Sequence, residues 1–409
     1  MSTFVFVEMP APGHVNPSLP IARELVRRGE RVEYVTDAEF QSAVERTGAT
    51  FHPHPTGVLT SRMIAEATQT GDLTRVPTVI LRATESLLPH MLDELPKLQP
   101  AAVVLDSNAV WGHAAAKLLR LPRVSLMTTL ILSSSAYTQL RPREWLHMLG
   151  PALPNIPHVL AARSRVLRRF GTSVFPRPAF PARGDLNIAL LPRDFQPDLP
   201  AVDNTFRFVG PVIDPDTRSG KLAFEPSESE PVVYISLGTL HRGSVDFFQQ
   251  CFTAFGAMPA RFLLAVGAQT DVQALGPIPS NFVVRASVPQ LEVLRHAAVF
   301  ITHGGMNSAL EGLWCGVPLI VIPQHLEQLA IGRHVASRGA AVVLRQHVAG
   351  ERVTAIDLRN ALAPMLSQPS YRAAAQTIQQ SLRLCGGYRQ AADEIQALVA
   401  RSPVGTTVA

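Results

Sequence analysis

Short apolar runs alternate with helical patterns along the whole of this 409-residue chain. In the first half the runs are Phe4–Val7, Val32–Val35, Ala102–Leu105, Arg123–Met127 and Leu186–Leu190, and in the second half they are Val232–Ser236, Phe262–Val266, Phe282–Arg285, Val299–Thr302 and Leu319–Ile322. Runs rich in Val, Ile and Leu suit strands buried on both faces of a parallel sheet, and the helices between them suit right-handed crossovers. The alternation therefore predicts an α/β fold with two parallel sheets.

The two halves meet at a polar segment, Asp214–Glu230, which is rich in Pro, Ser and Gly and is typical of a linker. A chain of this length is expected to form about two domains, and its 46% hydrophobic content supports sizeable cores. We therefore predict two facing Rossmann-like domains, residues 1–213 and 231–385, joined by a linker at 214–230. Residues 386–409 form the predicted C-terminal helix and tail.

Helical patterns set further expectations. The helix after the first strand is expected to begin near Pro17 and to stop at Gly29, and the pattern from Ser370 to Val399 also looks helical. Ser133–Phe180 is the least regular segment, and it carries a basic helical run, Val159–Arg169. That run resembles a helix that lies on a membrane surface, but its apolar face is modest, so we favour an ordinary solvated helix.

Composition excludes several classes of protein. The formal charge is +5, but the basic residues are scattered, which argues against a nucleic-acid surface and favours mild attraction for an anionic ligand. Three widely separated cysteines suit a reduced, cytoplasmic compartment. Thr3–Val7 is interpreted as a strand and not as part of a signal peptide, and no apolar stretch is long enough to span a bilayer. We expect a monomer or a weak homodimer.

The stretch Thr302–Glu311 carries the strongest chemical signal. Two glycines, Gly304 and Gly305, separate a strand from a helix, and such a junction presents free backbone N–H groups and a positive helix end to a phosphate. His303, Asn307 and Ser308 add side-chain donors, and Glu311 lies one turn further on, where it suits a ribose hydroxyl. Ser308 and Glu311 also fit a capping box, which needs no ligand.

A second group of residues suits general-base chemistry. His14 follows the first predicted strand, and Asp106 ends the strand Val103–Leu105. Ligands collect beyond the carboxyl ends of parallel strands, so a carboxylate there is placed to orient His14 as the base for an acceptor hydroxyl. Taken alone, His14 is as well explained as a helix cap, and Asp106 as a turn residue.

The motifs together resemble the family 1 UDP-glycosyltransferases, in particular the bacterial macrolide and natural-product type. The resemblance spans nearly the whole chain: it is carried by Pro12–Pro17, Phe208–Pro211, Ser236–Thr239 and the stretch from Val288-Pro289-Gln290 to Glu327-Gln328. It implies a GT-B fold with the active site in the cleft between the domains. It also implies that the segments Thr56–Asp72 and Ser133–Phe180 shape the acceptor pocket, and that the final helix crosses back onto the first domain.

The resemblance assigns roles to individual residues. His14 is the implied general base and Asp106 its partner, with Trp111 following at the expected position. The implied donor-binding residues are Thr239, Ser287, Val288, Gln290, His303, Gly305, Asn307, Ser308, Glu311, Glu327 and Gln328, of which Glu327 and Gln328 hold the sugar. Ser287 stands where the family usually has an aromatic residue, so base stacking is expected to be weaker or to come from Arg285. The choice between uridine and thymidine therefore stays open.

No metal site is evident. Asp214-Pro215-Asp216 imitates the Asp-x-Asp of metal-dependent glycosyltransferases, but it lies in the predicted linker and is interpreted as a turn. We therefore predict an enzyme without a cofactor: an inverting, metal-independent glycosyltransferase that moves a hexose, with glucose favoured, from a UDP- or dTDP-sugar to a hydroxyl of a hydrophobic small molecule. The alternatives are a sugar-nucleotide epimerase and a non-catalytic nucleotide-binding helper.

Overall fold

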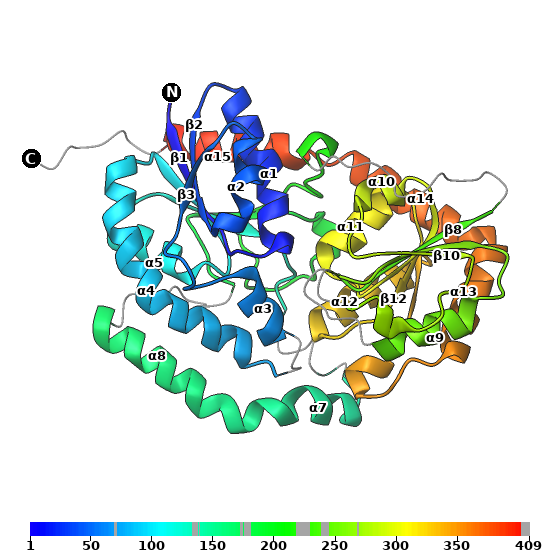
Figure 1. Ribbon diagram of the computed structural model, residues 1–409. Coiled ribbons are helices and arrows are strands. Elements are labelled where there is room, and N and C mark those ends of the chain that lie inside the picture. The colour runs from blue at the N-terminus through cyan, green and yellow to red at the C-terminus, as the bar shows by residue number, and fades with distance from the viewer. Residues whose placement is uncertain are drawn as a thin grey trace, which may run out of the picture.

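The computed structural model describes residues 1–68, 72–132, 138, 140–171, 175, 181–217, 230–238, 245–267 and 270–401. Two parallel β-sheets, one in each half of the chain, are flanked by helices (Figure 1). The predicted α/β fold with two parallel sheets is therefore confirmed. The predicted linker falls largely outside the described residues, at 218–229, as does the tail from 402 onward.

The first sheet has the strand order β3-β2-β1-β4-β5-β6-β7, and every neighbouring pair is parallel. Its strands are β1 (Thr3–Val7), β2 (Arg31–Thr36), β3 (Thr50–Pro53), β4 (Ala102–Asp106), β5 (Arg123–Met127), β6 (Leu186–Ala189) and β7 (Phe206–Phe208). The order reverses between β1 and β4. A crevice is expected beyond the carboxyl ends of these two strands, because the chain leaves them toward opposite faces of the sheet.

Helices cover both faces of the first sheet. The helices of this half of the chain are α1 (Pro12–Arg27), α2 (Gln41–Glu45), α3 (Ser61–Thr68), α4 (Arg75–Leu98), α5 (Val110–Leu118), α7 (Pro142–Leu149) and α8 (Ile156–Phe170), with 3-10 turns η1 (Ala38–Phe40), η2 (Gly150–Asn155), η3 (Arg193–Phe195) and η4 (Pro215–Thr217). Side chains of β1 alternate between the two layers. Phe4 and Phe6 join one buried core, and Val5 and Val7 join the other, as a strand covered on both faces requires.

The second sheet repeats this plan, with strand order β10-β9-β8-β11-β12-β13 and a reversal between β8 and β11. Its strands are β8 (Val232–Ser236), β9 (Arg261–Ala265), β10 (Phe282–Arg285), β11 (Ala297–Thr302), β12 (Leu319–Val321) and β13 (Ala341–Val343). The helices are α9 (Val245–Phe255), α10 (Gln290–Leu294), α11 (Met306–Trp314), α12 (Leu326–Ser337), α13 (Ala355–Ser367), α14 (Pro369–Arg383) and α15 (Gly387–Arg401), with 3-10 turns η5 (Gln273–Leu275) and η6 (Gln346–Ala349).

The two halves share buried contacts. Phe195 and Leu130 of the first half belong to the same apolar core as Leu310 of the second. Asp194 forms an ion pair with Arg338 at 2.6 Å beside that core. Asn307, which follows β11, donates to the carbonyl of Gly13, which follows β1, so the ends of these two central strands lie at the interface between the halves.

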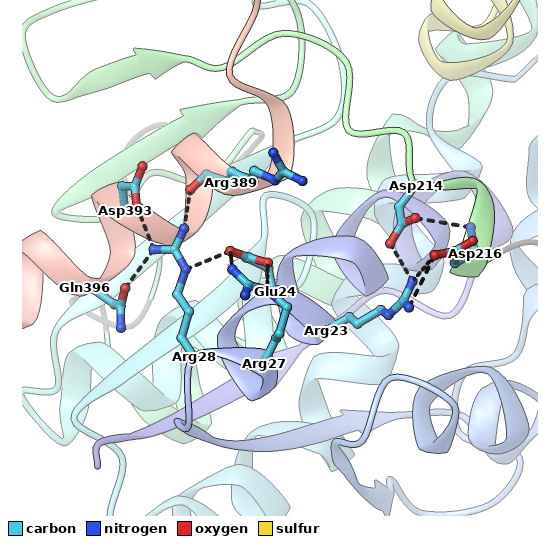
Figure 2. Close-up of polar contacts among 9 residues, drawn as sticks. All are labelled: Arg23, Glu24, Arg27, Arg28, Asp214, Asp216, Arg389, Asp393 and Gln396. Atoms are coloured by element: carbon cyan, nitrogen blue, oxygen red, sulfur yellow. Dashed lines mark hydrogen bonds and ion pairs between the residues drawn. The ribbon is translucent and has the colours of Figure 1, made fainter.

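Helix α15 packs back against α1, although it lies at the other end of the chain. Ile395 is buried in the core of the first sheet. Arg28 donates to Asp393 at 2.6 Å, to the side chain of Gln396 at 2.8 Å and to the carbonyl of Arg389 at 3.2 Å (Figure 2). Helix α15, which follows the second sheet in the chain, is therefore bound to α1 of the first half.

The structure corrects the expected start of α1. The helix begins at Pro12 and not near Pro17, so His14 lies in its first turn instead of a loop. Pro12 suits a first helical position. Pro17 lacks the N–H that the Gly13 carbonyl would accept inside the helix, and that carbonyl accepts the side-chain amide of Asn307 at 2.5 Å instead.

Two other expectations were incomplete. Strands β3, β7 and β13 were not predicted, and all three lie at sheet edges, where one side is open and no continuous apolar run is required. The single helical pattern from Ser370 to Val399 is two helices, α14 and α15, that are interrupted around Gly386. Gly387 has a φ of 54°, a left-handed conformation that ends the run.

Candidate active site

His14 and Asp106 meet at the reversal point of the first sheet. Strands β1 and β4 are parallel neighbours, so the residues that follow them emerge at the same edge. His14 Nδ1 lies 2.6 Å from Asp106 Oδ2, and because a carboxylate only accepts, Nδ1 carries the hydrogen. Among the described residues none hydrogen-bonds to Nε2 of His14, which leaves that nitrogen as the acceptor of a proton.

The surroundings of Asp106 hold its carboxylate in place. Asp106 is fully buried, and its second oxygen accepts the backbone N–H of Asn108 at 2.8 Å. Thr128, which follows β5, places its hydroxyl oxygen 3.3 Å from His14 Nδ1. The sequence motifs do not single out Thr128; the signal that points to it is its position directly after β5, the parallel neighbour of β4.

Electrostatics favour the protonated form of His14. Burial lowers the pKa of His14, but the charge of Asp106 and its hydrogen bond raise it more, with a smaller contribution from Glu327, so the net pKa lies above its usual value. The second half of the molecule thus acts on the histidine of the first. Nearby, burial and then the charge of Asp106 raise the pKa of Glu8 well above its usual value.

Glycines enclose the imidazole of His303, which follows β11. A Cβ added to Gly238 would lie 2.7 Å from His303 Cε1, and one added to Gly305 would lie 2.5 Å from His303 Nε2. Gly238 and Gly304 also have φ values of 89° and 81°, a left-handed conformation that favours glycine. The glycines therefore let the backbone close around the ring at the reversal point of the second sheet.

The N-terminus of α11 faces the N-terminus of α1. Asn307 donates to the carbonyl of Gly13 at 2.5 Å, which places it one residue from His14. The capping box considered for Ser308 and Glu311 is wrong, because α11 begins at Met306 with Gly305 as its N-cap and without a side-chain cap. Ser308 therefore stands within the first turn of the helix, half-buried and close to its positive end.

The buried Glu311 and the half-buried Gln290 form a polar pair beside this turn. Gln290 donates to Glu311 Oε2 at 2.7 Å and accepts the hydroxyl of Tyr234 at 3.2 Å. The three side chains come from α10, α11 and β8, so the pair lies beside the carboxyl ends of the central strands. A carboxylate fixed by an amide in this way suits vicinal hydroxyl groups.

The segment between β10 and α10 contains Ser287 and Val288. Ser287 is exposed and Val288 is partly buried against the core shared by the two halves. The side chain of Arg285 donates to the carbonyl of its neighbour Val284 at 2.9 Å. Thr239 lies outside the described residues, so its predicted phosphate contact stays a prediction.

Glu327 and Gln328 occupy the first turn of α12. Burial raises the pKa of Glu327 to about 7, while a backbone hydrogen bond to Leu130 and the charge of His14 oppose this shift. Gln328 accepts the backbone N–H of Gln324 at 2.8 Å, which fixes its amide at the start of the helix. Glu327 therefore lies within electrostatic range of His14 although the two belong to different sheets.

Asp214 and Asp216 have a structural partner. Arg23 of α1 donates to Asp214 at 2.8 Å, and its ion pair with Asp216 measures 3.3 Å (Figure 2). Over the part of the chain that the structure describes, no cluster of three or more His, Cys, Asp or Glu side chains is arranged to hold a metal ion. Nor does any described helix have the length and apolar character needed to cross a membrane.

The structure thus groups most of the predicted residues around one interface. His14 and Asp106 lie on one side, and those on the other side are Ser287, Val288, Gln290, His303, Gly305, Asn307, Ser308, Glu311, Glu327 and Gln328. A base with a fixed tautomer faces a glycine-lined helix end across this interface. That arrangement suits transfer of a group from a phosphate-linked donor to a hydroxyl.

Comparison with known proteins identifies the family of the chain. A model of the family described as UDP-glucoronosyl and UDP-glucosyl transferase matches residues 163–381. The chain is 33% identical to the NDP-glycosyltransferase YjiC of Bacillus licheniformis, with 97% of each chain covered. It is 30% identical to the oleandomycin glycosyltransferase of Streptomyces antibioticus, with 95% of this chain and 88% of that one covered.

A solved structure extends the comparison to the fold. The glycosyltransferase of kitacinnamycin superposes with a TM-score of 0.79 and is 29% identical, and the match covers 97% of this chain and 98% of that one. The predicted GT-B arrangement of two Rossmann-like units is confirmed by this likeness together with the two parallel sheets.

Proposed function

Because the chain belongs to the UDP-glucoronosyl and UDP-glucosyl transferase family and is therefore a glycosyltransferase, we propose that it moves a hexose, with glucose the first candidate, from a UDP- or dTDP-sugar to a hydroxyl of a lipophilic small molecule. The observation that carries this proposal is the 2.6 Å contact between His14 and Asp106, which faces the glycine junction of the second half. The reaction is inverting and needs no metal ion.

His14 acts on the acceptor. Its Nε2 removes the proton of the acceptor hydroxyl while Asp106 stabilises the imidazolium that forms. The acceptor oxygen attacks the anomeric carbon from the side opposite the diphosphate, the bond to the diphosphate breaks, and the configuration inverts. The proton remains on His14 until it is lost to solvent.

The second half holds the donor. The positive end of α11, His303 and Ser308 are placed to stabilise the charge that develops on the diphosphate, and Thr239 is proposed to join them. Asn307 already reaches the Gly13 carbonyl, so it also links the donor site to the helix of His14. Gln290 and Glu311 hold the ribose.

Glu327 and Gln328 hold the hydroxyls of the sugar, and Ser287 with Val288 lies beside the base. Burial raises the pKa of Glu327 to about 7, so its carboxyl takes up a proton more readily than an ordinary glutamate does. The exposed Ser287 offers no aromatic face to the base, so the proposal leaves uridine and thymidine donors as equal candidates.

The acceptor class rests on similarity alone. One relative that is 30% identical is named for transfer to oleandomycin, which supports macrolides and comparable lipophilic alcohols or phenols as acceptors. The first half of the chain, residues 1–213, is proposed to bind the acceptor, and residues 231–385 the nucleotide sugar. The segments around 56–72 and 133–180 border the pocket in this proposal.

The test is incubation with UDP-glucose and dTDP-glucose, each with a panel of phenols and macrolides, followed by mass spectrometry. A new glycoside with inverted anomeric configuration supports the proposal. Conversion of the sugar nucleotide without a glycoside would make the protein an epimerase, and binding without turnover would make it a helper.

A chelator tests metal independence. We expect the rate of transfer to be unchanged after its addition, and a loss of activity that magnesium or manganese restores would contradict the prediction.

A further inference from the structure

Exposed apolar side chains gather on one outer segment of the molecule, residues 141–170, which we call the outer strap. It comprises α7, η2 and α8, which run along the lower edge of the molecule (Figure 1). Of the twelve large apolar side chains that are exposed in the described part of the chain, five lie here: Trp145, Leu146, Leu153, Ile156 and Leu160. Leu146, Leu153 and Leu160 are 75%, 66% and 54% exposed. Single exposed leucines are common on protein surfaces, but several in one segment are typical of an interaction site.

The exposed charged side chains of the outer strap are all arginines. Six arginines of the strap are exposed: Arg141, Arg143, Arg163, Arg165, Arg168 and Arg169. Its one carboxylate, Glu144, is buried and paired with Arg345 at 2.6 Å. Neighbouring elements supply Glu351 beside Arg143 and Glu85 beside Arg165, whereas no described residue pairs with Arg163 or Arg168. The outward surface is therefore apolar and cationic.

The inward side of the strap is already occupied. Met148 packs against Leu329 of α12, and Ala162 and Val166 are buried in the core that includes α4. The inward side therefore offers no room for the exposed leucines. In α8, Ile156 and Leu160 are one helical turn apart on the outer side, with Arg163 following at the next turn and Arg168 two turns beyond Leu160.

We propose that the outer strap is a docking surface for an anionic lipid bilayer, on which the protein lies peripherally. Leucines flanked by arginines are the composition of helices that rest in the membrane interface, where the apolar side chains enter the acyl boundary and the guanidinium groups meet anionic headgroups. A symmetric dimer through this face would oppose the two sets of arginines, so charge disfavours a second copy.

The proposal takes up the membrane-surface alternative that the sequence offered for Val159–Arg169. That segment alone has a modest apolar face, but α7 and η2, the parts of the strap that precede α8, expose Leu146 and Leu153 as well. If the acceptor is lipophilic, as the proposed function holds, this position lets it reach the cleft from the bilayer. Membrane docking itself does not depend on that function.

The experiment is co-sedimentation of the full chain with vesicles of phosphatidylcholine alone or with about 30% phosphatidylglycerol. We expect at least roughly tenfold stronger partition to the anionic vesicles, with most of it lost at about 0.5 M salt. Two variants, L146S/L153S/L160S and R163E/R168E, should each lose at least about tenfold in partition. The control I356S/L384S alters exposed apolar residues elsewhere, at 65% and 89% exposure, and should bind as the wild type does.

Each outcome decides the proposal. Wild-type protein that stays in the supernatant with anionic vesicles at low salt overturns it, and so does equal loss in the control variant. A wild type that elutes as a dimer while both strap variants elute as monomers assigns the surface to a second copy instead. Circular dichroism and the melting temperature of each variant show whether it is folded, and glycosyl transfer in detergent-free buffer reports separately on the proposed function.

Discussion

At the scale of single residues, the site depends on which proton each side chain carries. His14 is held by a buried carboxylate in one tautomer, and Asp106 has both oxygens engaged. The same carboxylate that orients His14 also raises its pKa, so the base is free only at somewhat higher pH than an ordinary histidine. Orientation and basicity therefore cannot be changed separately at this position.

Replacing His14 by Ala should lower the turnover number by about 100-fold or more while UDP affinity is unchanged, because the base is lost and the donor site is not.

In the wild type, kcat/KM should rise with pH through an apparent pKa above the usual value of 6.5, since the unprotonated base is the active form and its pKa is raised. Asp106→Asn should move this rise to lower pH, because burial is then opposed only by the smaller contribution of Glu327, and should reduce the plateau by about tenfold or more.

The check is a pH–rate profile with an alcohol acceptor. A phenol of low pKa is a poor acceptor for this purpose because it ionises without a base. An Asp106→Asn profile with the same midpoint as the wild type would contradict the assignment of Asp106 as the partner that sets the pKa of His14.

Gln328 and His303 should separate sugar binding from nucleotide binding. Gln328→Ala should lower transfer and change the preferred hexose, yet leave the Kd of free UDP within about threefold, because UDP lacks the sugar hydroxyls. His303→Ala should weaken free UDP by about 1–3 kcal/mol, roughly 5- to 150-fold in Kd. Calorimetric titration of UDP into both variants measures the difference, and equal weakening would show that the division is incorrect.

At the scale of elements, two strand-to-helix junctions form the site. Helices α1 and α11 both begin where the order of their sheet reverses, and Asn307 joins the two ends through the Gly13 carbonyl. Pro17 cannot donate to that carbonyl within α1. The Gly13 carbonyl is therefore available to Asn307 of the second half. The glycines around His303 provide the space that the second junction needs.

Gly305→Ala tests this junction. The added Cβ would fall 2.5 Å from His303 Nε2, so the imidazole must move, and UDP affinity should fall by about tenfold through the lost phosphate contact. The φ of Gly305 is −59°, so backbone strain does not contribute. Gly150→Ala is the matched control, because its φ is −52° and its nearest neighbouring atom lies 4.0 Å away. Calorimetry that finds normal UDP binding in Gly305→Ala would refute the steric argument.

At the scale of the whole molecule, the last helix of the chain packs against the first sheet. Helix α15 follows the second sheet but fills the core of the first, and Arg28 anchors it to α1 (Figure 2). The core around Phe195 and Leu310 joins the halves at a second place. The stability of the first sheet therefore depends on residues that are about 400 positions away from its first strand.

Ile395→Ala should lower the free energy of unfolding by about 2–5 kcal/mol, because it empties a fully buried position between α15 and the first sheet. Ile356→Ala makes the same chemical change at a side chain that is 65% exposed, and should cost less than about 0.5 kcal/mol. Urea denaturation followed by circular dichroism compares the two. Similar midpoints would mean that α15 does not support the first half.

The sequence by itself determined the α/β class, the central strands and the two junction motifs, because buried parallel strands and glycine turns are local patterns that need no knowledge of their neighbours. The sequence did not predict edge strands such as Phe206–Phe208. An edge strand pairs on one side only, so it needs no apolar run that local composition would reveal. Tertiary structure alone decided that Asn307 supplies the partner of the Gly13 carbonyl, that Thr128 approaches His14, and that Leu146, Leu153 and Leu160 are left exposed. Each of these depends on distances between segments far apart in the chain, which packing fixes and periodicity does not.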